Sequence, residues 1–271
     1  GHRWVICMFR RILRNSQSKL LVRLLGDRRT WTAYAGRYGS WEDALRESSG
    51  YDSAIILNRV LEATRKVASS PGLWERDSVV FDSNEVNQPV LDCLLAVAGA
   101  AGGRLSVLDF GGSLGSVWWQ HRTHLAHLPQ IRWCVVEQPT FADIGRKEFQ
   151  TNELRFYETV ETCIARESPN VILLSSVLPY VRKPYELIDT LSETDCEDMI
   201  IDRTGFTSGD KDLLTVQYVP SNIYRASYPC WFLSEPRFLA KVGENWDVRK
   251  RWDNSDSVSR PFFYQGLFLR R

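Results

Sequence analysis

The sequence predicts an α/β protein with a doubly wound, mostly parallel sheet. Short apolar runs alternate with helix-length segments from about residue 86 onward. These runs are apolar enough to be buried on both faces, which is typical of parallel strands. A glycine-rich turn joins one run to the next helix, where ligand sites form in such sheets. Together, the alternation and the turn predict a ligand site at the carboxyl edge of the sheet.

The expected elements follow one another along the chain. Helical periodicity, interrupted by clusters such as Ser69 to Gly72, predicts helices at 53–70, 86–101, 114–127, 139–149, 159–166 and 184–191. Apolar runs predict strands at 105–109, 131–137, 154–157, 171–176 and 198–202. Because these strands are expected to be parallel, their carboxyl ends meet at one edge.

The alternation stops after residue 202. Residues 203–233 are polar and aromatic with little period, so we expect an irregular connection that is long for a plain link. Ser234, followed by Glu235 and Pro236, predicts the start of a helix over 234–243. Strand-like segments at 246–252 and 261–269 are expected to form a final antiparallel pair.

Residues 1–72 differ from residues 73–271, and we expect them to form an N-terminal segment beside the α/β domain. The first 30 residues contain eight Lys or Arg against a single Asp, a net charge of +7. Interleaved apolar residues predict a basic amphipathic helix over 3–25, which either lies on an anionic membrane or packs on the domain. Aromatic and glycine residues gather over 31–53, and we expect a loop or lid there.

Composition excludes several classes of protein. The chain has 271 residues, 44% of them hydrophobic and 25% charged, which is an ordinary globular profile. Its net charge of +1 gives no sign of nucleic-acid binding. The six cysteines form no C-x-x-C pair, which indicates reduced thiols in a cytoplasmic protein. His121, His124 and His127 have no nearby acid to complete a metal site, so we expect no metal.

The glycine-rich turn begins at Asp109 and reads D-F-G-G-S-L-G. Gly111, Gly112 and Gly115 allow a tight turn and a close approach to a ligand. The helix that follows offers free N–H groups to a carboxylate or phosphate. Ser113 stands where the dinucleotide pattern G-x-G-x-x-G has its second glycine, which argues against an NAD site.

Polar residues end the other predicted strands at the same edge. Glu137 ends the second strand, where an acid accepts hydrogen bonds from a cofactor ribose. Ser175 and Ser176 end the fourth strand, and Asp202 with Arg203 ends the fifth. We therefore expect these side chains to line one cavity.

Eight short segments together resemble a bacterial family of S-adenosylmethionine (SAM) dependent methyltransferases, several members of which are associated with surface-polysaccharide biosynthesis. The segments are 38–41, 50–52, 107–115, 133–138, 178–180, 201–203, 216–217 and 227–229. The resemblance implies a class I, Rossmann-like methyltransferase fold with an antiparallel last strand, and SAM as cofactor. It favours oxygen methylation of a saccharide or glycolipid precursor and leaves the exact acceptor open.

Strand ends, the turn and the resemblance assign expected roles to residues. We expect cofactor binding from Asp109, Gly111, Gly112, Ser113, Gly115, Glu137, Ser175 and Ser176. We expect acceptor binding from Tyr38, Trp41, Arg203, Gln217, Tyr224 and Tyr228. Aromatic faces suit sugars, and a guanidinium suits an anionic group. Candidates for the base that removes a hydroxyl proton are Asp202, Tyr180 and His121.

Two other functions remain open from the sequence. One is a non-catalytic subunit of a glycan-assembly complex that has the same fold and is anchored by its basic helix. The other is an NAD-dependent oxidoreductase, against which the missing middle glycine argues. The partner expected in each enzymatic case is a small molecule, and the sequence does not indicate an oligomeric state.

Overall fold

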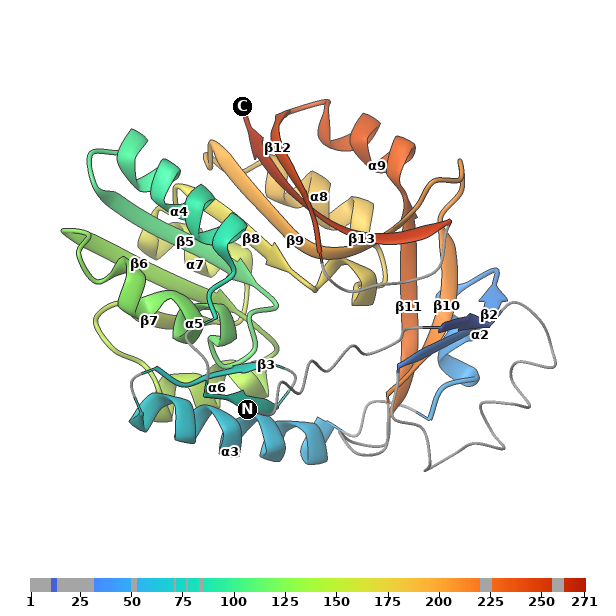
Figure 1. Ribbon diagram of the computed structural model, residues 1–271, viewed down its shortest axis with the longest axis horizontal. Helices are drawn as coiled ribbons and strands as arrows, with labels where there is room; N and C mark the ends of the chain where they lie inside the picture. The colour runs from blue at the N-terminus through green and yellow to red at the C-terminus, as the bar shows by residue number, and fades with distance from the viewer. Residues whose placement is uncertain are drawn as a thin grey trace, which may run out of the picture.

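A central mixed sheet organises the protein, shown as a computed structural model in Figure 1. The structure describes residues 11–13, 32–49, 53–70, 72–76, 78–82, 85–219, 226–254 and 261–271. None of the helices in these ranges is long and apolar enough to cross a bilayer.

Five parallel strands form the core of the sheet. They are β5 (Arg104–Phe110), β6 (Gln130–Val136), β7 (Leu154–Tyr157), β8 (Val171–Ser175) and β9 (Asp198–Thr207). Their order is β9-β8-β5-β6-β7, so the chain builds outward from β5 in both directions. Strand β13 (Phe262–Arg270) runs antiparallel to β9 and to β12 (Asp247–Asp253). This order and the antiparallel last strand confirm the predicted class I, Rossmann-like fold.

Helices cover both faces of the parallel sheet (Figure 1). One face packs against α4 (Gln88–Ala100), α5 (Ser116–Leu125) and α6 (Pro139–Glu148). The other packs against α7 (Val160–Glu167), α8 (Pro184–Ser192) and α9 (Glu235–Val242). Neighbouring residues of a strand enter opposite cores, as Val107 and Leu108 do in β5. Burial on both faces explains why these strands read as continuous apolar runs.

A second group of strands extends the sheet beyond β9, at the end far from β7 (Figure 1). Strand β11 (Ser227–Ser234) pairs with the end of β9, and β10 (Leu213–Tyr218) runs antiparallel to β11. The prediction of an irregular connection over 203–233 is therefore wrong for most of that range. The strands escaped prediction because polar side chains such as Thr215 and Gln217 are buried in them, which removes the alternating pattern.

The N-terminal region also contributes to this extension. Strand β2 (Ala33–Tyr38) pairs antiparallel with β10, where we expected a loop. Helix α2 (Trp41–Arg46) follows, and Ser40 Oγ accepts the Asp43 N–H at 3.1 Å, which caps the start of this helix.

Only a small part of the predicted basic helix over 3–25 lies among the described residues. Strand β1 (Arg11–Leu13) runs parallel to β2, so the prediction of a helix is wrong at these three residues. Pairing with a neighbouring strand has overridden the local helical period there. The rest of the predicted helix lies outside the described residues.

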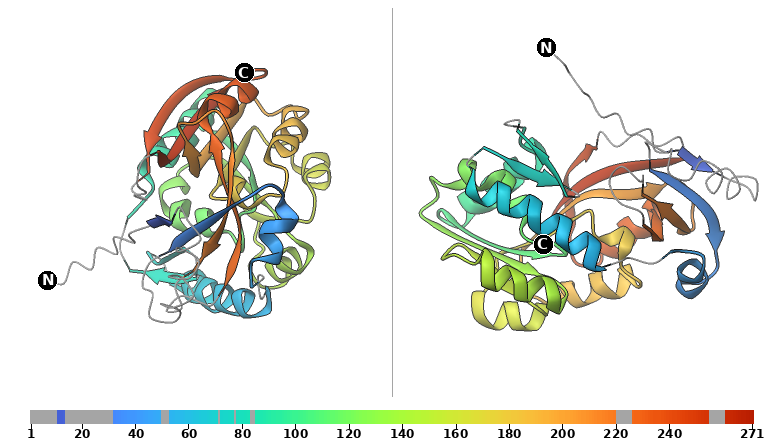
Figure 2. Two further views of the ribbon diagram at one scale, coloured as in Figure 1. Left: turned by 90° about the vertical axis from the view of Figure 1, so that its right-hand side faces the viewer. Right: turned by 90° about the horizontal axis from the view of Figure 1, so that it is seen from below.

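Helix α3 (Ser53–Ser69) and a short hairpin complete the arrangement. The hairpin consists of β3 (Trp74–Arg76) and β4 (Val79–Phe81), and β3 contacts both α3 and α5. Seen from below, α3 runs across the molecule in front of the parallel sheet (Figure 2). Helix α3, from the predicted segment 1–72, and the hairpin, from the predicted domain 73–271, thus both pack close to the edge where the site is expected.

Candidate functional site

A cavity of about 1270 Å³ opens at the carboxyl edge of the parallel strands. The residues of this edge that line the cavity include Asp109, Glu137 and Asp202. The cavity is also lined by Glu75 from the β3–β4 hairpin and by Tyr228 from the second group of strands. Typical small-molecule sites measure roughly 300–1,000 Å³. The cavity therefore has room for two small molecules side by side.

The glycine-rich turn has the conformation that its sequence predicts. Gly111 and Gly115 have φ of +72° and +90°, and Ser113 has φ of +57°. A Cβ atom on Gly111 would lie closer than 3.0 Å to Val177, and one on Gly112 closer than 3.0 Å to the Asp109 carboxylate. The protein's own packing therefore requires glycine at both positions, whether or not a ligand is bound.

Asp109 is a buried carboxyl with unused hydrogen-bonding capacity. It is 1% exposed, and its Oδ2 accepts a hydrogen bond of 2.9 Å from Trp133 Nε1. Its Oδ1 is buried and has no donor among the described residues. Burial raises the pKa of Asp109 to about 7, the Trp133 hydrogen bond opposes this, and the charge of Glu137 adds to it. A buried acceptor without a donor costs free energy, so this oxygen points to a ligand donor.

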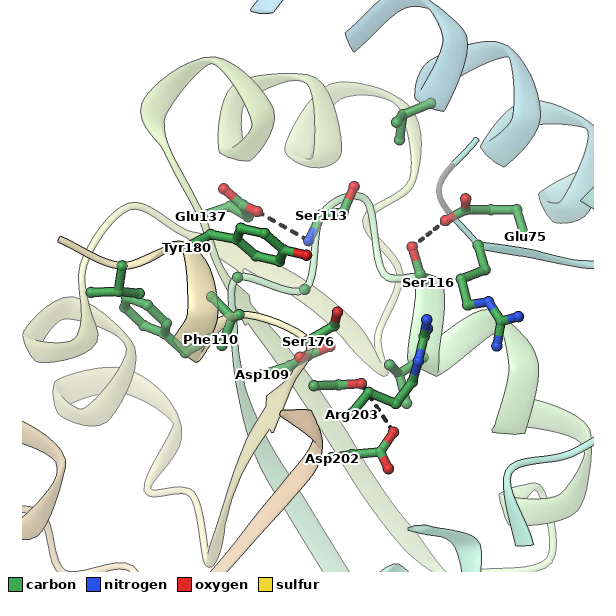
Figure 3. A pocket seen from close by; sticks show the side chains of 18 of the residues that line it. Glu75, Asp109, Phe110, Ser113, Ser116, Glu137, Ser176, Tyr180, Asp202 and Arg203 are labelled. Atoms are coloured by element: carbon green, nitrogen blue, oxygen red, sulfur yellow. Dashed lines mark hydrogen bonds between the residues drawn. The ribbon is translucent and has the colours of Figure 1, made fainter. Parts of the chain in front are cut away.

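Glu137 directly follows β6 and is held by two backbone groups. Its Oε1 accepts the Ser113 N–H at 3.2 Å, and its Oε2 accepts the Gln138 N–H at 2.8 Å (Figure 3). Burial raises the pKa of Glu137. Each oxygen keeps further capacity to accept, so the carboxylate is fixed in place and remains able to bind the hydroxyls of a ribose.

Left-handed backbone residues stand directly after β8 and inside β9, which continues to Thr207 instead of ending at residue 202 as predicted. Ser176 and Arg203 have φ of +57° and +50°, which is costly for residues other than glycine. The Ser176 N–H donates to the Asp202 carbonyl at 2.9 Å, so the end of β8 is tied to β9 at this point. The Arg203 side chain extends from within β9 into the cavity (Figure 3). The structure thus places all these predicted residues at one edge.

Asp202 is surrounded by donors. Its Oδ1 accepts from Trp252 Nε1 and Asn254 Nδ2, both at 3.0 Å. Its Oδ2 accepts from Asn87 Nδ2 at 2.8 Å and from Ser175 Oγ at 3.4 Å. Because these four contacts occupy both oxygens, the geometry favours a positioning role for Asp202 over the predicted role of a base. The sequence analysis missed Asn87, Trp252 and Asn254, which no motif marks.

Tyr180 belongs to a polar and aromatic cluster with residues of β10 and β11. Its hydroxyl donates to Gln217 Oε1 at 2.8 Å, and Gln217 Nε2 donates to the Tyr228 hydroxyl at 3.5 Å. The two tyrosine rings meet edge to face at 5.4 Å. Burial raises the pKa of Tyr180 well above its ordinary value, so it stays protonated and is a donor rather than a base. All three residues line the cavity.

His121 does not fit the predicted role of a base. It is fully buried, with Nδ1 2.8 Å from the Val117 carbonyl and Nε2 3.3 Å from the Asn87 carbonyl. Burial lowers its pKa, and it is not among the residues that line the cavity. It packs behind the cavity and supports the backbone at Asn87.

The aromatic residues predicted to bind an acceptor take different positions. Trp41 lines the cavity and stacks on Trp231, with ring centroids 6.3 Å apart. Tyr38 instead packs in a small core with Ala44 and Leu214, away from the cavity lining. Tyr224 lies outside the described residues.

Glu75 is a cavity residue that the sequence analysis missed. It is 2% exposed, and it accepts hydrogen bonds from the Ser116 hydroxyl and from the Ser78 N–H, the latter at 3.2 Å (Figure 3). Since Ser116 begins α5, the carboxylate lies at the end of that helix which favours negative charge. Among the described residues, no cluster of three or more His, Cys, Asp or Glu side chains is arranged to hold a metal ion.

No protein-family model matches the chain, and no curated protein matches its sequence. Among solved structures, the N-terminal domain of EvdMO1, crystallised in the presence of S-adenosylhomocysteine (SAH) and D-fucose, has a TM-score of 0.47 and 14% identity, covering 82% of this chain and 98% of that one. Magnesium protoporphyrin IX methyltransferase from Synechocystis PCC 6803, with bound SAH, has a TM-score of 0.46 and 15% identity, covering 82% and 100%. The [4+2]-cyclase SpnF has a TM-score of 0.47 and 11% identity, covering 81% and 94%. Similarity at this level does not carry an activity over to the chain.

Proposed function

We propose that the protein is a SAM-dependent methyltransferase. The observation that supports this most strongly is the buried Asp109 Oδ1, which has no donor among the described residues and lies beside a turn that requires glycine. The ammonium group of SAM offers the donor that this oxygen lacks. The ribose of SAM offers hydroxyl donors to Glu137, at the end of the neighbouring strand. The residues present therefore fit this cofactor.

When bound, the cofactor would supply an electrophilic methyl group on a sulfonium. The protein's part is to hold the donor and the acceptor in line, since proximity and orientation account for much of the rate. The turn from Asp109 to Ser113 and the Glu137 carboxylate would fix the donor. The cluster of Tyr180, Gln217 and Tyr228 would orient the acceptor through hydrogen bonds.

We further propose a hydroxyl of a saccharide or glycolipid precursor as the acceptor, in surface-polysaccharide biosynthesis. Trp41 and Tyr228 line the cavity together with Gln217, and aromatic rings beside an amide suit the apolar face and the hydroxyls of a sugar. The sequence resemblance points to the same class of substrate.

A SAH-release assay with a panel of acceptors tests this assignment. We expect turnover with saccharides or glycolipids and none with amines of similar size. Tyr228→Phe should keep SAH affinity and lower turnover about tenfold, which corresponds to about 1.4 kcal/mol, because one hydroxyl contact is lost. Turnover on amines alone would contradict the proposed acceptor class, and unchanged turnover in Tyr228→Phe would remove this residue from the acceptor site.

The basic N-terminal segment carries a separate proposal. We propose that the protein is cytoplasmic and contacts anionic membranes peripherally through residues 3–29, because basic and apolar residues are interleaved on both sides of strand β1 and give the first 30 residues a net charge of +7. In vesicle flotation at low salt, the full chain should float with anionic vesicles, and a chain lacking residues 3–29 should stay at the bottom. Failure of the full chain to float would rule out this contact.

A further inference from the structure

The hydrogen bonds around Asp202 fix the orientation of two side-chain amides. Asp202 uses both of its oxygens as acceptors, toward Asn254 and Asn87 at 3.0 and 2.8 Å. A carboxylate can only accept, so each asparagine must turn its NH₂ group toward Asp202. The carbonyl oxygen of each amide must consequently point elsewhere.

The two carbonyl oxygens have different fates. Asn254 Oδ1 accepts the Arg203 N–H at 3.1 Å, which satisfies it within the protein. Asn87 lines the cavity. Its Oδ1 has no donor among the described residues and is not enclosed by protein atoms. The Asn87 backbone is itself fixed, because its carbonyl accepts the Leu91 N–H at 2.9 Å. Asn87 Oδ1 is therefore an oriented acceptor that remains open to a ligand.

We infer that Asn87 binds the ammonium group at the amino-acid end of the cofactor through Oδ1, and that Asp202 is the positioning residue that keeps this oxygen turned to the ligand. This inference rests on the proposed function. Its support is that Asn87 offers an open acceptor without a protein donor in a cavity that Asp109 also lines, and that the buried Asp109 Oδ1 has no protein donor either. Asp109 and Asp202 are both buried acids that line this cavity, and an acid in its ionised form favours a cation over a neutral hydroxyl.

The geometry allows a test in which the amide is reversed and the network is kept, provided that the Ser175 hydroxyl, which now donates to Asp202 Oδ2, turns to accept instead. In Asp202→Asn, the new carbonyl oxygen still accepts from Trp252 and Asn254, and the new NH₂ group faces Asn87. Asn87 must then rotate to accept, which turns its own NH₂ group to the ligand. In the double variant Asn87→Asp with Asp202→Asn, residue 87 again presents an oxygen, and the net charge equals that of the wild type.

Calorimetry with SAH and with 5′-methylthioadenosine, which lacks the amino-acid end, measures the effect. We expect Asn87→Ala to weaken SAH binding about tenfold, through loss of one charge-assisted hydrogen bond. Asp202→Asn should weaken it by more than about tenfold, and the double variant should return to within about threefold of the wild type. Binding of 5′-methylthioadenosine should stay constant throughout, which a general disturbance of the fold would not allow.

Three outcomes would contradict this inference in different ways. If Asn87→Ala binds SAH as the wild type does, Asn87 is not a ligand contact, and the proposed function stands. If SAH and 5′-methylthioadenosine weaken equally, the amide pair only supports the fold. If the wild type binds neither compound, the proposed function itself fails.

Discussion

Asp109→Asn should abolish detectable SAH binding and, at pH 8, raise the melting temperature. Burial raises the pKa of Asp109 to about 7, so between about pH 4 and pH 7 the folded protein holds a proton that the unfolded chain has lost. The free energy of unfolding therefore falls as pH rises through this window and levels off above it. Asparagine does not ionise, so the variant should gain up to about 4 kcal/mol at pH 8 and little below pH 4.

The same substitution removes the charge that the ammonium of SAM requires. Loss of a buried charged partner costs about 2–5 kcal/mol, so SAH affinity should fall by a factor of 100 or more. For the wild type, SAH affinity should rise with pH up to about 7, as the carboxyl ionises. Thermal melts at pH 4 and pH 8, with calorimetry at pH 8, measure both effects. A variant that binds SAH normally would contradict the assigned role.

Asp198→Asn is the matched control for this experiment. Asp198 is a buried acid like Asp109, but it lies at the start of β9, at the edge of the sheet far from the cavity. Its two oxygens accept hydrogen bonds from Arg270 at 2.7 and 2.9 Å. Its substitution leaves a guanidinium without its partner, so it should lower the melting temperature and leave SAH binding intact. Opposite changes in melting temperature for the two variants would show that the effect at Asp109 is specific to its site and is not the general cost of removing a buried acid.

Gly112→Ala should also abolish SAH binding. A methyl group at this position would lie closer than 3.0 Å to the Asp109 carboxylate, which Trp133 holds from the other side. Either the carboxylate or the turn must move, and each of them is expected to contact the cofactor. We expect SAH affinity to fall at least roughly 100-fold, because the site loses its geometry and not a single contact. Calorimetry on the folded variant measures this loss.

Gly99→Ala is the control for Gly112→Ala. Gly99 lies in α4, and a methyl group there would meet nothing within 4 Å. Alanine should stabilise the helix by up to about 1 kcal/mol and leave SAH binding unchanged. Wild-type SAH affinity in Gly112→Ala would show that the turn does not hold the cofactor.

The parallel core was predictable because each strand and helix carries its own local pattern. The apolar run of β8 (Val171–Ser175) and the turn after Asp109 need no distant partner to be recognised. Strands β2 and β10 were not predicted, because their stability comes from pairing with each other across the chain. Their buried Gln217 and Thr215 also hide the alternation by which a strand is recognised.

The candidate site divides in the same way. Asp109 and Glu137 were found because an acid at the end of a parallel strand has a predictable position. Asn87 and Asn254 reach Asp202 from 115 and 52 residues away in sequence, and no local pattern announces those contacts. His121 shows the opposite error, since its nearness to the glycine turn in sequence did not bring it into the cavity.

Calorimetric titration of the wild-type protein with SAH and with NAD, at pH 8, tests the central claim most directly. A cavity with Asp109 at its base and Ser113 in place of a second glycine should bind one SAH per chain and should not bind NAD. Binding of NAD, or no binding of SAH at millimolar concentration, would contradict the assignment of this cavity to a SAM-type cofactor.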